Sequence, residues 1–449
     1  MQLFNELCLR YEQSDWAHNP EFGLLDAILE EHPELYDEIK ADVLIDTKES
    51  TLGRKDTPSV EQIVRAALYK ELKGLDYREL EYSQLDSRIC STFIKLDGRK
   101  PYSFQMFQKY ISKISSTSLE GLLIGLNKIA INEGLEDIKQ IRIDSTVVKT
   151  NIHYPTNNSL VWDCIKESHR LLSKLADQTH GLEIRNYTKS AKRNYYKINV
   201  IKSKDKRIKL FANQLILFTK SINQVDQVIR NPKKKVYSLE AIGIAVLLED
   251  LLPLMRQVYS MTKKRELLGE KVPNKEKLFS IYELHTDIIV KGGREVLFGH
   301  KVNITGGRSN LILDCETLDG NPSDTNLYQN TLDRITENYG IVPRDVCTDG
   351  GYASNANKEY AESKGIVNIV FNKIVGSLQN IVSSKKMETM LKKWRSGIEA
   401  VISNYKRGFG MFICNWKGKE HYKAKVLWSA IAYNIRVMTR LVISQIKLA

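Results

Sequence analysis

The first part of the chain shows apolar residues at helical spacing. Six of them line one face of residues 60–72. Asp76 and Glu79 form a capping-box pattern that starts a second helix, and Ser103 is placed to start a third. Short helices joined by tight turns predict a helix-turn-helix-like domain over residues 55–135. The same spacing is also typical of any small helical bundle.

The period changes to two further along the chain, and this change predicts a β-sheet. Residues 139–152 alternate between apolar and polar positions, which is the pattern of a strand. Residues 281–320 contain short apolar runs separated by glycines, Gly299 among them, which predicts antiparallel strands with tight turns. Helical and strand patterns then alternate and end in a helix over residues 385–403.

The order of these elements predicts the fold class. Once a helical insertion is set aside, antiparallel strands are followed by alternating helices and strands, which is the topology of a ribonuclease-H-like α/β core. We expect an acidic helical leader, a helical DNA-binding domain, the core, a basic helical insertion within the core, and a C-terminal helix. The expected boundaries are, in that order, 1–54, 55–135, 136–157 with 281–419, 158–280, and 420–449.

Charge is distributed unevenly along the chain. The 449 residues include 67 lysines and arginines and 54 aspartates and glutamates, a formal net charge of +13. Residues 1–50 hold 13 acidic and 3 basic residues, so the rest of the chain carries +23. A basic body is typical of a protein that binds a polyanion, nucleic acid above all. A solvated, lysine-rich surface is the alternative.

Neither a membrane segment nor a secretory signal is predicted. The best apolar run, residues 241–248, is much shorter than the roughly 20 residues that cross a bilayer. The first ten residues lack a basic region followed by an apolar stretch. The six cysteines are widely spaced and form no CxxC pair, so we expect reduced, mostly buried thiols. These features predict a cytoplasmic protein without a membrane partner.

Three acidic residues stand where chemistry is expected. Asp144 lies in a strand between Ile143 and Val147, where a carboxylate is costly to bury without a partner. Asp349 ends another strand, the position where α/β sheets form ligand sites, and Glu399 lies on a helix. Three carboxylates can hold two Mg²⁺ ions about 3.5–4 Å apart, because hard cations prefer oxygen ligands. Taken singly, each acid also fits an ordinary role as a satisfied strand acid, a turn residue or a solvated helix residue.

These residues and their neighbours resemble the DDE transposases of bacterial insertion sequences, most closely the ISNCY-type group. Residues 57–111 are similar to the N-terminal helical domain of these proteins. In and just after the helix predicted over residues 385–403, Arg395, Glu399 and Lys406 reproduce the spacing of the related YREK signature. Lys392 stands in place of its tyrosine. The other matching motifs are Arg142-Ile143-Asp144-Ser145-Thr146-Val147-Val148 and Asp349-Gly350-Gly351-Tyr352.

The resemblance implies a role for each of these residues. Asp144, Asp349 and Glu399 would be the catalytic ligands of two Mg²⁺ ions, for which Mn²⁺ could substitute. Arg395 and Lys406 would contact DNA phosphates. An i,i+4 ion pair is the alternative for Arg395 and Glu399.

The resemblance also implies a function. The protein would be an insertion-sequence transposase, associated with the bacterial nucleoid, that binds the terminal inverted repeats of its element. It would cleave DNA strands and transfer them to target DNA, acting as a homodimer on double-stranded DNA. The alternatives are a metal-dependent DNA nuclease of the same fold and a catalytically inert, transposase-derived DNA-binding protein.

A basic segment with interleaved tyrosines lies inside the expected insertion. Lysine and arginine contact phosphates and tyrosine stacks on unpaired bases, so this segment is expected to bind DNA. A solvated helix face is the alternative. Three more lysines follow at residues 233–235. The cations of the segment are Lys189, Lys192, Arg193, Lys197, Lys202, Lys204, Lys206, Arg207 and Lys209.

Overall fold

The computed structural model of the protein describes two units of the chain. One consists of the chain up to Asn151 together with the chain from Asp287 on, and the other of Ile152–Thr286. Much of the expected acidic leader and the lysines at 233–235 lie outside the described residues. The described residues are 19–44, 57–96, 98–179, 182–230, 238–291, 295–374 and 376–448.

Helices form the beginning of the first unit. Ser59 caps α4 through the Gln62 N–H, and Asp76 caps α5 together with Glu79, which is the capping box that the sequence predicts. Ser103 caps α7, also as predicted. The helix starts are therefore confirmed, whereas a helix-turn-helix role in DNA binding stays a prediction. The helices are α2 (Pro20–Glu31), α3 (Asp37–Leu44), α4 (Val60–Lys73), α5 (Tyr77–Asp86), α6 (Arg88–Phe93), α7 (Phe104–Ile111) and α8 (Ser116–Asn132).

A buried arginine joins the acidic helix α2 to α4. The guanidinium of Arg65 lies 2.6 Å from the Asp26 carboxylate and 2.7 Å from the Glu30 carboxylate. It also lies 2.9 Å from Glu61, one turn earlier on its own helix. A buried charge without partners would be strongly destabilising. Part of the negative charge of the leader is therefore neutralised inside the fold.

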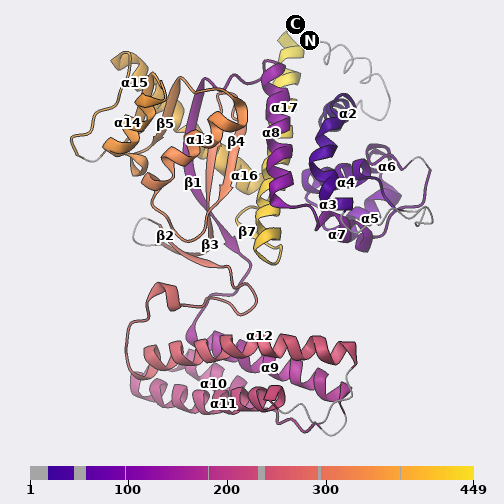
Figure 1. Cartoon of the computed structure of the whole chain (residues 1–449), viewed down its shortest axis with the longest axis vertical. Helices are drawn as coiled ribbons and strands as arrows, with labels where there is room; N and C mark the ends of the chain where they lie inside the picture. Colours follow the sequence, from indigo (N-terminus) through magenta and orange to yellow (C-terminus); the bar gives the residue numbers. More distant parts are fainter. Residues whose placement is uncertain are drawn as a thin grey trace. The chain divides into compact units, whose positions relative to one another are not determined.

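Within the described residues, seven strands form one mixed sheet in the first unit (Figure 1). Their order is β2-β3-β1-β5-β6, while β4 also pairs with β3 and β7 with the end of β1. β3 is antiparallel to β1 and β4, and β5 and β6 continue parallel to β1. This mixed arrangement is compatible with the expected ribonuclease-H-like core. The strands are β1 (Gln140–Thr150), β2 (Asp287–Lys291), β3 (Glu295–Gly306), β4 (Ile312–Thr317), β5 (Asp345–Asp349), β6 (Asn368–Asn372) and β7 (Ile413–Cys414).

The structure differs from the sequence prediction at Gly299. The sequence predicts a turn there, but β3 passes through this residue without a break. Gly299 pairs with Lys149 on β1, and a Cβ at this position would collide with the backbone carbonyl of Val148. The glycine is therefore required by the close approach of two strands and not by a turn.

Helices that pack on the sheet complete the core of the first unit. α17 packs along α8 (Figure 1) and also against α4, and Trp428 on α17 is fully buried. By length and composition alone, α17 could cross a membrane, but 72% of its apolar window is buried inside the fold. Such burial is typical of a core helix. The helices of this part are α13 (Tyr328–Tyr339), α14 (Asn355–Ser363), α15 (Lys385–Arg395), α16 (Gly397–Gly408) and α17 (Lys419–Leu448).

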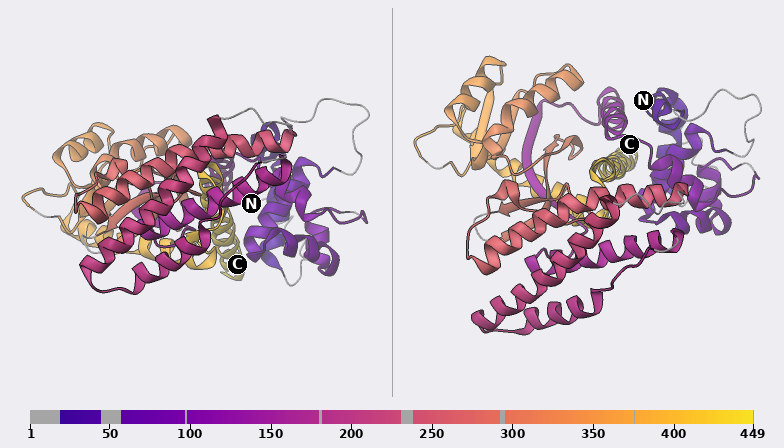
Figure 2. Two further views of the ribbon diagram at one scale, coloured as in Figure 1. Left: turned by 90° about the horizontal axis from the view of Figure 1, so that it is seen from below. Right: turned by 60° about the horizontal axis from the view of Figure 1, so that its bottom comes forward.

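Four long helices make up most of the described part of the second unit. Figure 2 shows them lying alongside one another, and they enclose a core of their own that includes Phe218, Leu248 and Met255. The expected insertion, residues 158–280, lies within this unit, whose limits are 152 and 286. The helices are α9 (Asn157–Gln178), α10 (Thr188–Val200), α11 (Lys204–Arg230) and α12 (Leu239–Thr262).

Candidate active site

Asp144 and Asp349 occupy neighbouring positions on adjacent strands. β1 and β5 are parallel, and their register pairs Ile143 with Thr348, so the next residue on each strand is an aspartate. In a parallel pair, residues at the same level point to the same face of the sheet. Both aspartates are half-buried. The sheet therefore brings the first two predicted acids together.

Glu399 lies in the first turn of α16, after a break in the helix. The sequence predicts one helix over residues 385–403, but α15 ends at Arg395 and α16 begins at Gly397. This part of the prediction is wrong, since two helices replace one. The break leaves Arg395 at the end of one helix and Glu399 at the start of the next.

Arg142, on the central strand β1, explains the break. Its Nη1 donates a hydrogen bond of 2.7 Å to the carbonyl of Trp394, and its guanidinium lies 4.7 Å from the centre of the Trp394 ring. In a continuous helix, that carbonyl would accept from the N–H four residues later. A Cβ at Gly397 would collide with the Arg142 guanidinium, so the glycine leaves room for this contact. Burial lowers the pKa of Arg142, but a guanidinium stays charged in proteins.

Arg395 is the common partner of the three acids. Its Nη2 lies 2.9 Å from Asp144 Oδ2 and 4.0 Å from Asp349 Oδ1. Its Nη1 lies 3.3 Å from Glu399 Oε1, so the ion pair weighed as an alternative is present. Arg395 is only 4% exposed. The structure thus gathers the three acids around this arginine, while its contact with DNA phosphate stays a prediction.

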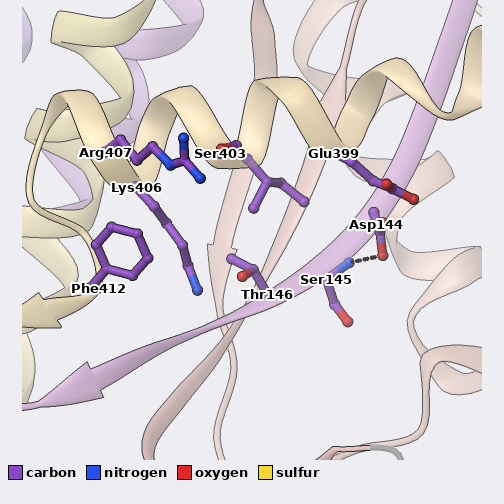
Figure 3. Close-up of a pocket in the computed structure, with 9 residues that line it drawn as sticks. Asp144, Ser145, Thr146, Glu399, Ser403, Lys406, Arg407 and Phe412 are labelled. Carbon is purple, nitrogen blue, oxygen red and sulfur yellow. Dashed lines mark hydrogen bonds between the residues drawn. The ribbon is translucent and has the colours of Figure 1, made fainter.

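A pocket of about 260 Å³ opens beside these carboxylates. Figure 3 shows Asp144 and Glu399 close together at one end of it. At the other end lie Lys406, Arg407 and Phe412 (Figure 3). The Nζ of Lys406 donates a hydrogen bond of 2.7 Å to the carbonyl of Val147 on β1. The predicted phosphate-binding lysine therefore lines the same pocket as Asp144 and Glu399, and Arg407 adds a cation that was not among the predicted site residues.

The donor set of the site has the chemistry that a hard divalent cation requires. Three carboxylates approach the guanidinium of Arg395, and carboxylate oxygens are the ligands that Mg²⁺ prefers. In the residues that the structure describes, no three Asp, Glu, His or Cys side chains are close enough together to hold an ion directly. The acids meet around a guanidinium instead.

A fourth carboxylate stands beside the site. Asp324 Oδ1 accepts a hydrogen bond of 3.0 Å from the Ser145 hydroxyl and lies 2.6 Å from Lys301 Nζ. Lys301 also donates to the carbonyl of Pro322 at 2.9 Å. Neither residue of this ion pair was among the predicted site residues. A lysine between the short apolar runs of a predicted strand region is a signal for Lys301, whereas an acid at the start of a helical segment is too common to mark Asp324.

Tyr352, in the Asp-Gly-Gly-Tyr motif, lies behind this part of the site. Its side chain is fully buried, and its hydroxyl donates a hydrogen bond of 2.9 Å to Asn303 Oδ1. Burial raises the pKa of Tyr352 well above its ordinary value, and the negative charges of Asp324 and Asp144 act in the same direction. The hydroxyl therefore stays neutral and serves as a hydrogen-bond donor.

The nine cations of the basic segment belong to the second unit. They lie on α10, on α11 and on the turn between them, and all nine are exposed. Lys197, Lys206 and Lys209 border a groove of about 590 Å³ that is also lined by Val200 and Leu210. Exposure fits both DNA contact and a solvated face, so DNA binding by this segment stays a prediction.

Comparison with known proteins finds a match for the part of the first unit that contains Asp349 and Glu399. No curated protein and no solved structure matches the chain. Residues 290–435 match the family described as the transposase DDE domain. This range contains Asp349, Arg395 and Glu399, and it begins after Asp144. The match supports a DDE transposase in general.

Proposed function

We propose that the protein is an insertion-sequence transposase that binds the terminal inverted repeats of its element, cleaves DNA strands there and joins them to target DNA. The proposal includes the ISNCY-type group, with its relation to the YREK signature. It also includes action in the bacterial cytoplasm, on the nucleoid, with two copies of the chain on paired DNA ends. The observation that carries it is the convergence of Asp144, Asp349 and Glu399 on the guanidinium of Arg395. The same chain contains a segment that matches the transposase DDE domain.

The residues of the pocket, together with Asp349, suit strand cleavage and joining. Asp144, Asp349 and Glu399 would hold the divalent cations. Bound there, Mg²⁺ supplies activation of an attacking water or 3′-hydroxyl and stabilisation of the leaving oxygen. Lys406 and Arg407 line the same pocket and are placed to bind the neighbouring phosphates of the substrate strand.

The proposal is tested with the full chain, Mg²⁺ and duplex DNA taken from the two ends of the element that encodes it. We expect cut ends and joined products, and neither product when EDTA removes the metal. Asp144→Asn, Asp349→Asn and Glu399→Gln should each abolish both products while DNA binding remains, because only the ligand charge is lost. Asp319→Asn is the matched control, since this acid is 71% exposed and pairs with Lys419.

The products separate this proposal from its alternatives. Cut ends without joined products would favour a nuclease, and DNA binding without cutting in the unmodified chain would favour an inert DNA-binding protein. Full cleavage by any of the three variants would contradict the assignment of that acid.

A further inference from the structure

The guanidinium of Arg395 occupies the place where the three carboxylates meet. It contacts Asp144 at 2.9 Å, and it reaches the other two acids at 4.0 and 3.3 Å. Arginine cannot give up its charge at physiological pH. The negative charge of the three carboxylates is therefore partly neutralised, within the protein itself, by a fixed positive group.

The bonding of Arg395 is incomplete in this position. Its Nε is buried and has no hydrogen-bond acceptor in the described part of the chain. Its distance to Asp349 is at the limit of an ion pair. A buried donor without an acceptor is unfavourable, so the guanidinium would gain from an acceptor that satisfies more of its N–H groups. A phosphate is such an acceptor, because it can take two parallel hydrogen bonds from the guanidinium fork.

A divalent cation and the Arg395 guanidinium compete for the same oxygens. Both are positive, and each is stabilised by the carboxylates of Asp144, Asp349 and Glu399. As long as Arg395 stays among them, an ion that approaches meets carboxylates that are already paired and a like charge nearby. The arrangement of this site therefore disfavours metal binding until Arg395 moves away.

We propose that Arg395 is a positioning residue that holds the three carboxylates together in the metal-free protein and withholds them from divalent cations until DNA phosphate draws its guanidinium away. This inference rests on the proposed function and adds a regulation of the same site. It predicts that metal and DNA bind cooperatively, since each favours the state in which Arg395 has left the carboxylates. A protein built in this way would bind its metal firmly only where a strand is present to be cut.

The proposal is tested by Mn²⁺ binding to the full chain without DNA, measured from the electron paramagnetic resonance signal of free Mn²⁺. The Asp144→Asn/Asp349→Asn/Glu399→Gln triple variant gives the background that does not involve these carboxylates. Arg395→Met should bind Mn²⁺ at least about tenfold more tightly than the unmodified chain, and Arg395→Lys, which keeps the charge, should not. Lys392→Met is the matched control. It removes a positive charge from the same helix, but the ion-pair partner of Lys392 is Glu388. Equal Mn²⁺ affinity of Arg395→Met and the unmodified chain would overturn the proposal.

A second measurement uses the unmodified chain alone and covers the case in which Arg395→Met does not fold. Adding duplex DNA should raise the affinity for Mn²⁺ by about tenfold over the background of the triple variant with the same DNA. No effect of DNA on the Mn²⁺ affinity would overturn the proposal. Neither measurement depends on cleavage, so a chain that shows this competition but cuts no DNA would contradict the proposed function and leave the role of Arg395 intact.

Discussion

Arg395 Nη2 lies 2.9 Å from Asp144 Oδ2, although the two residues are 251 positions apart in the sequence. A second contact runs in the opposite direction, because Arg142 on β1 donates to the carbonyl of Trp394 on α15. The two arginines therefore bind the corner between α15 and α16 to the central strand at two adjacent points. This corner places Glu399 beside Asp144.

Gly397→Ala should loosen this corner. The added Cβ would collide with the buried Arg142 guanidinium, and such overpacking costs about 1–3 kcal/mol of the free energy of unfolding. Thermal and urea denaturation of the full chain measure the loss. Gly243→Ala is the control, since this helical glycine of α12 has open space around it, and the change should stabilise the chain by about 0.5–1 kcal/mol. Equal effects of the two substitutions would show that the Gly397 contact is unimportant.

Asp324→Asn should destabilise the first unit, because it leaves the buried ammonium of Lys301 without its carboxylate. The expected cost is about 1–3 kcal/mol, measured by urea denaturation. Adding Lys301→Met to this variant should recover part of the loss, since the unpaired charge is then removed. The exposed pair of Asp319 and Lys419 serves as control, where Asp319→Asn should change stability by no more than about 0.5 kcal/mol. Purely additive effects at Asp324 and Lys301 would contradict the coupling.

Replacing Lys197, Lys206 and Lys209 together by glutamine should weaken DNA binding and its dependence on salt. If each lysine contacts one phosphate, the slope of log K against log salt should fall by about 0.9 for each of them. Fluorescence anisotropy with a labelled duplex at several salt concentrations measures the slope. An unchanged slope would favour the solvated-face interpretation. The control removes an equal charge from other exposed positions of the same unit, Lys174, Lys271 and Lys275.

Phe412→Ala should weaken the binding of DNA ends that carry an unpaired terminal nucleotide. This ring is 50% exposed and lines the pocket that holds Asp144 and Glu399, which places it where a base could stack. Stacking of a base on an aromatic ring contributes about 1–3 kcal/mol, which corresponds to about 5- to 150-fold in Kd. The neighbouring Ile413 is exposed but does not line the pocket, so Ile413→Ala is the control. An equal loss of affinity for fully paired, blunt DNA would show that Phe412 does not act on unpaired bases.

Local signals in the sequence were sufficient for most elements of the fold. The capping box at Asp76 satisfies backbone groups within three residues, so the helix that it starts could be predicted without any knowledge of the rest of the chain. The alternation over residues 139–152 likewise reflects one strand with two different faces. The three acids were noticed from their places in these elements and from the motifs around them, since each taken singly also fits an ordinary role.

The errors at Gly299 and in the helix over residues 385–403 share one cause. Each depends on a distant segment, namely the Val148 carbonyl in the first case and the Arg142 side chain in the second. A glycine reads as a turn when only its neighbours are known, and no local pattern shows that another backbone passes within contact distance.

The sequence by itself determined most of the helices and strands, because periodicity and capping act over a few residues, and its motifs pointed to the three acids. Only the tertiary structure decided which residues share a site. It brought Asp144, Asp349 and Glu399 to a single guanidinium, and it added Asp324 with Lys301 beside them. The physical reason is that a buried charge must be paired, and its partner is whichever opposite charge the packed chain brings near. That partner depends on strand register and helix packing far along the chain from the charge itself.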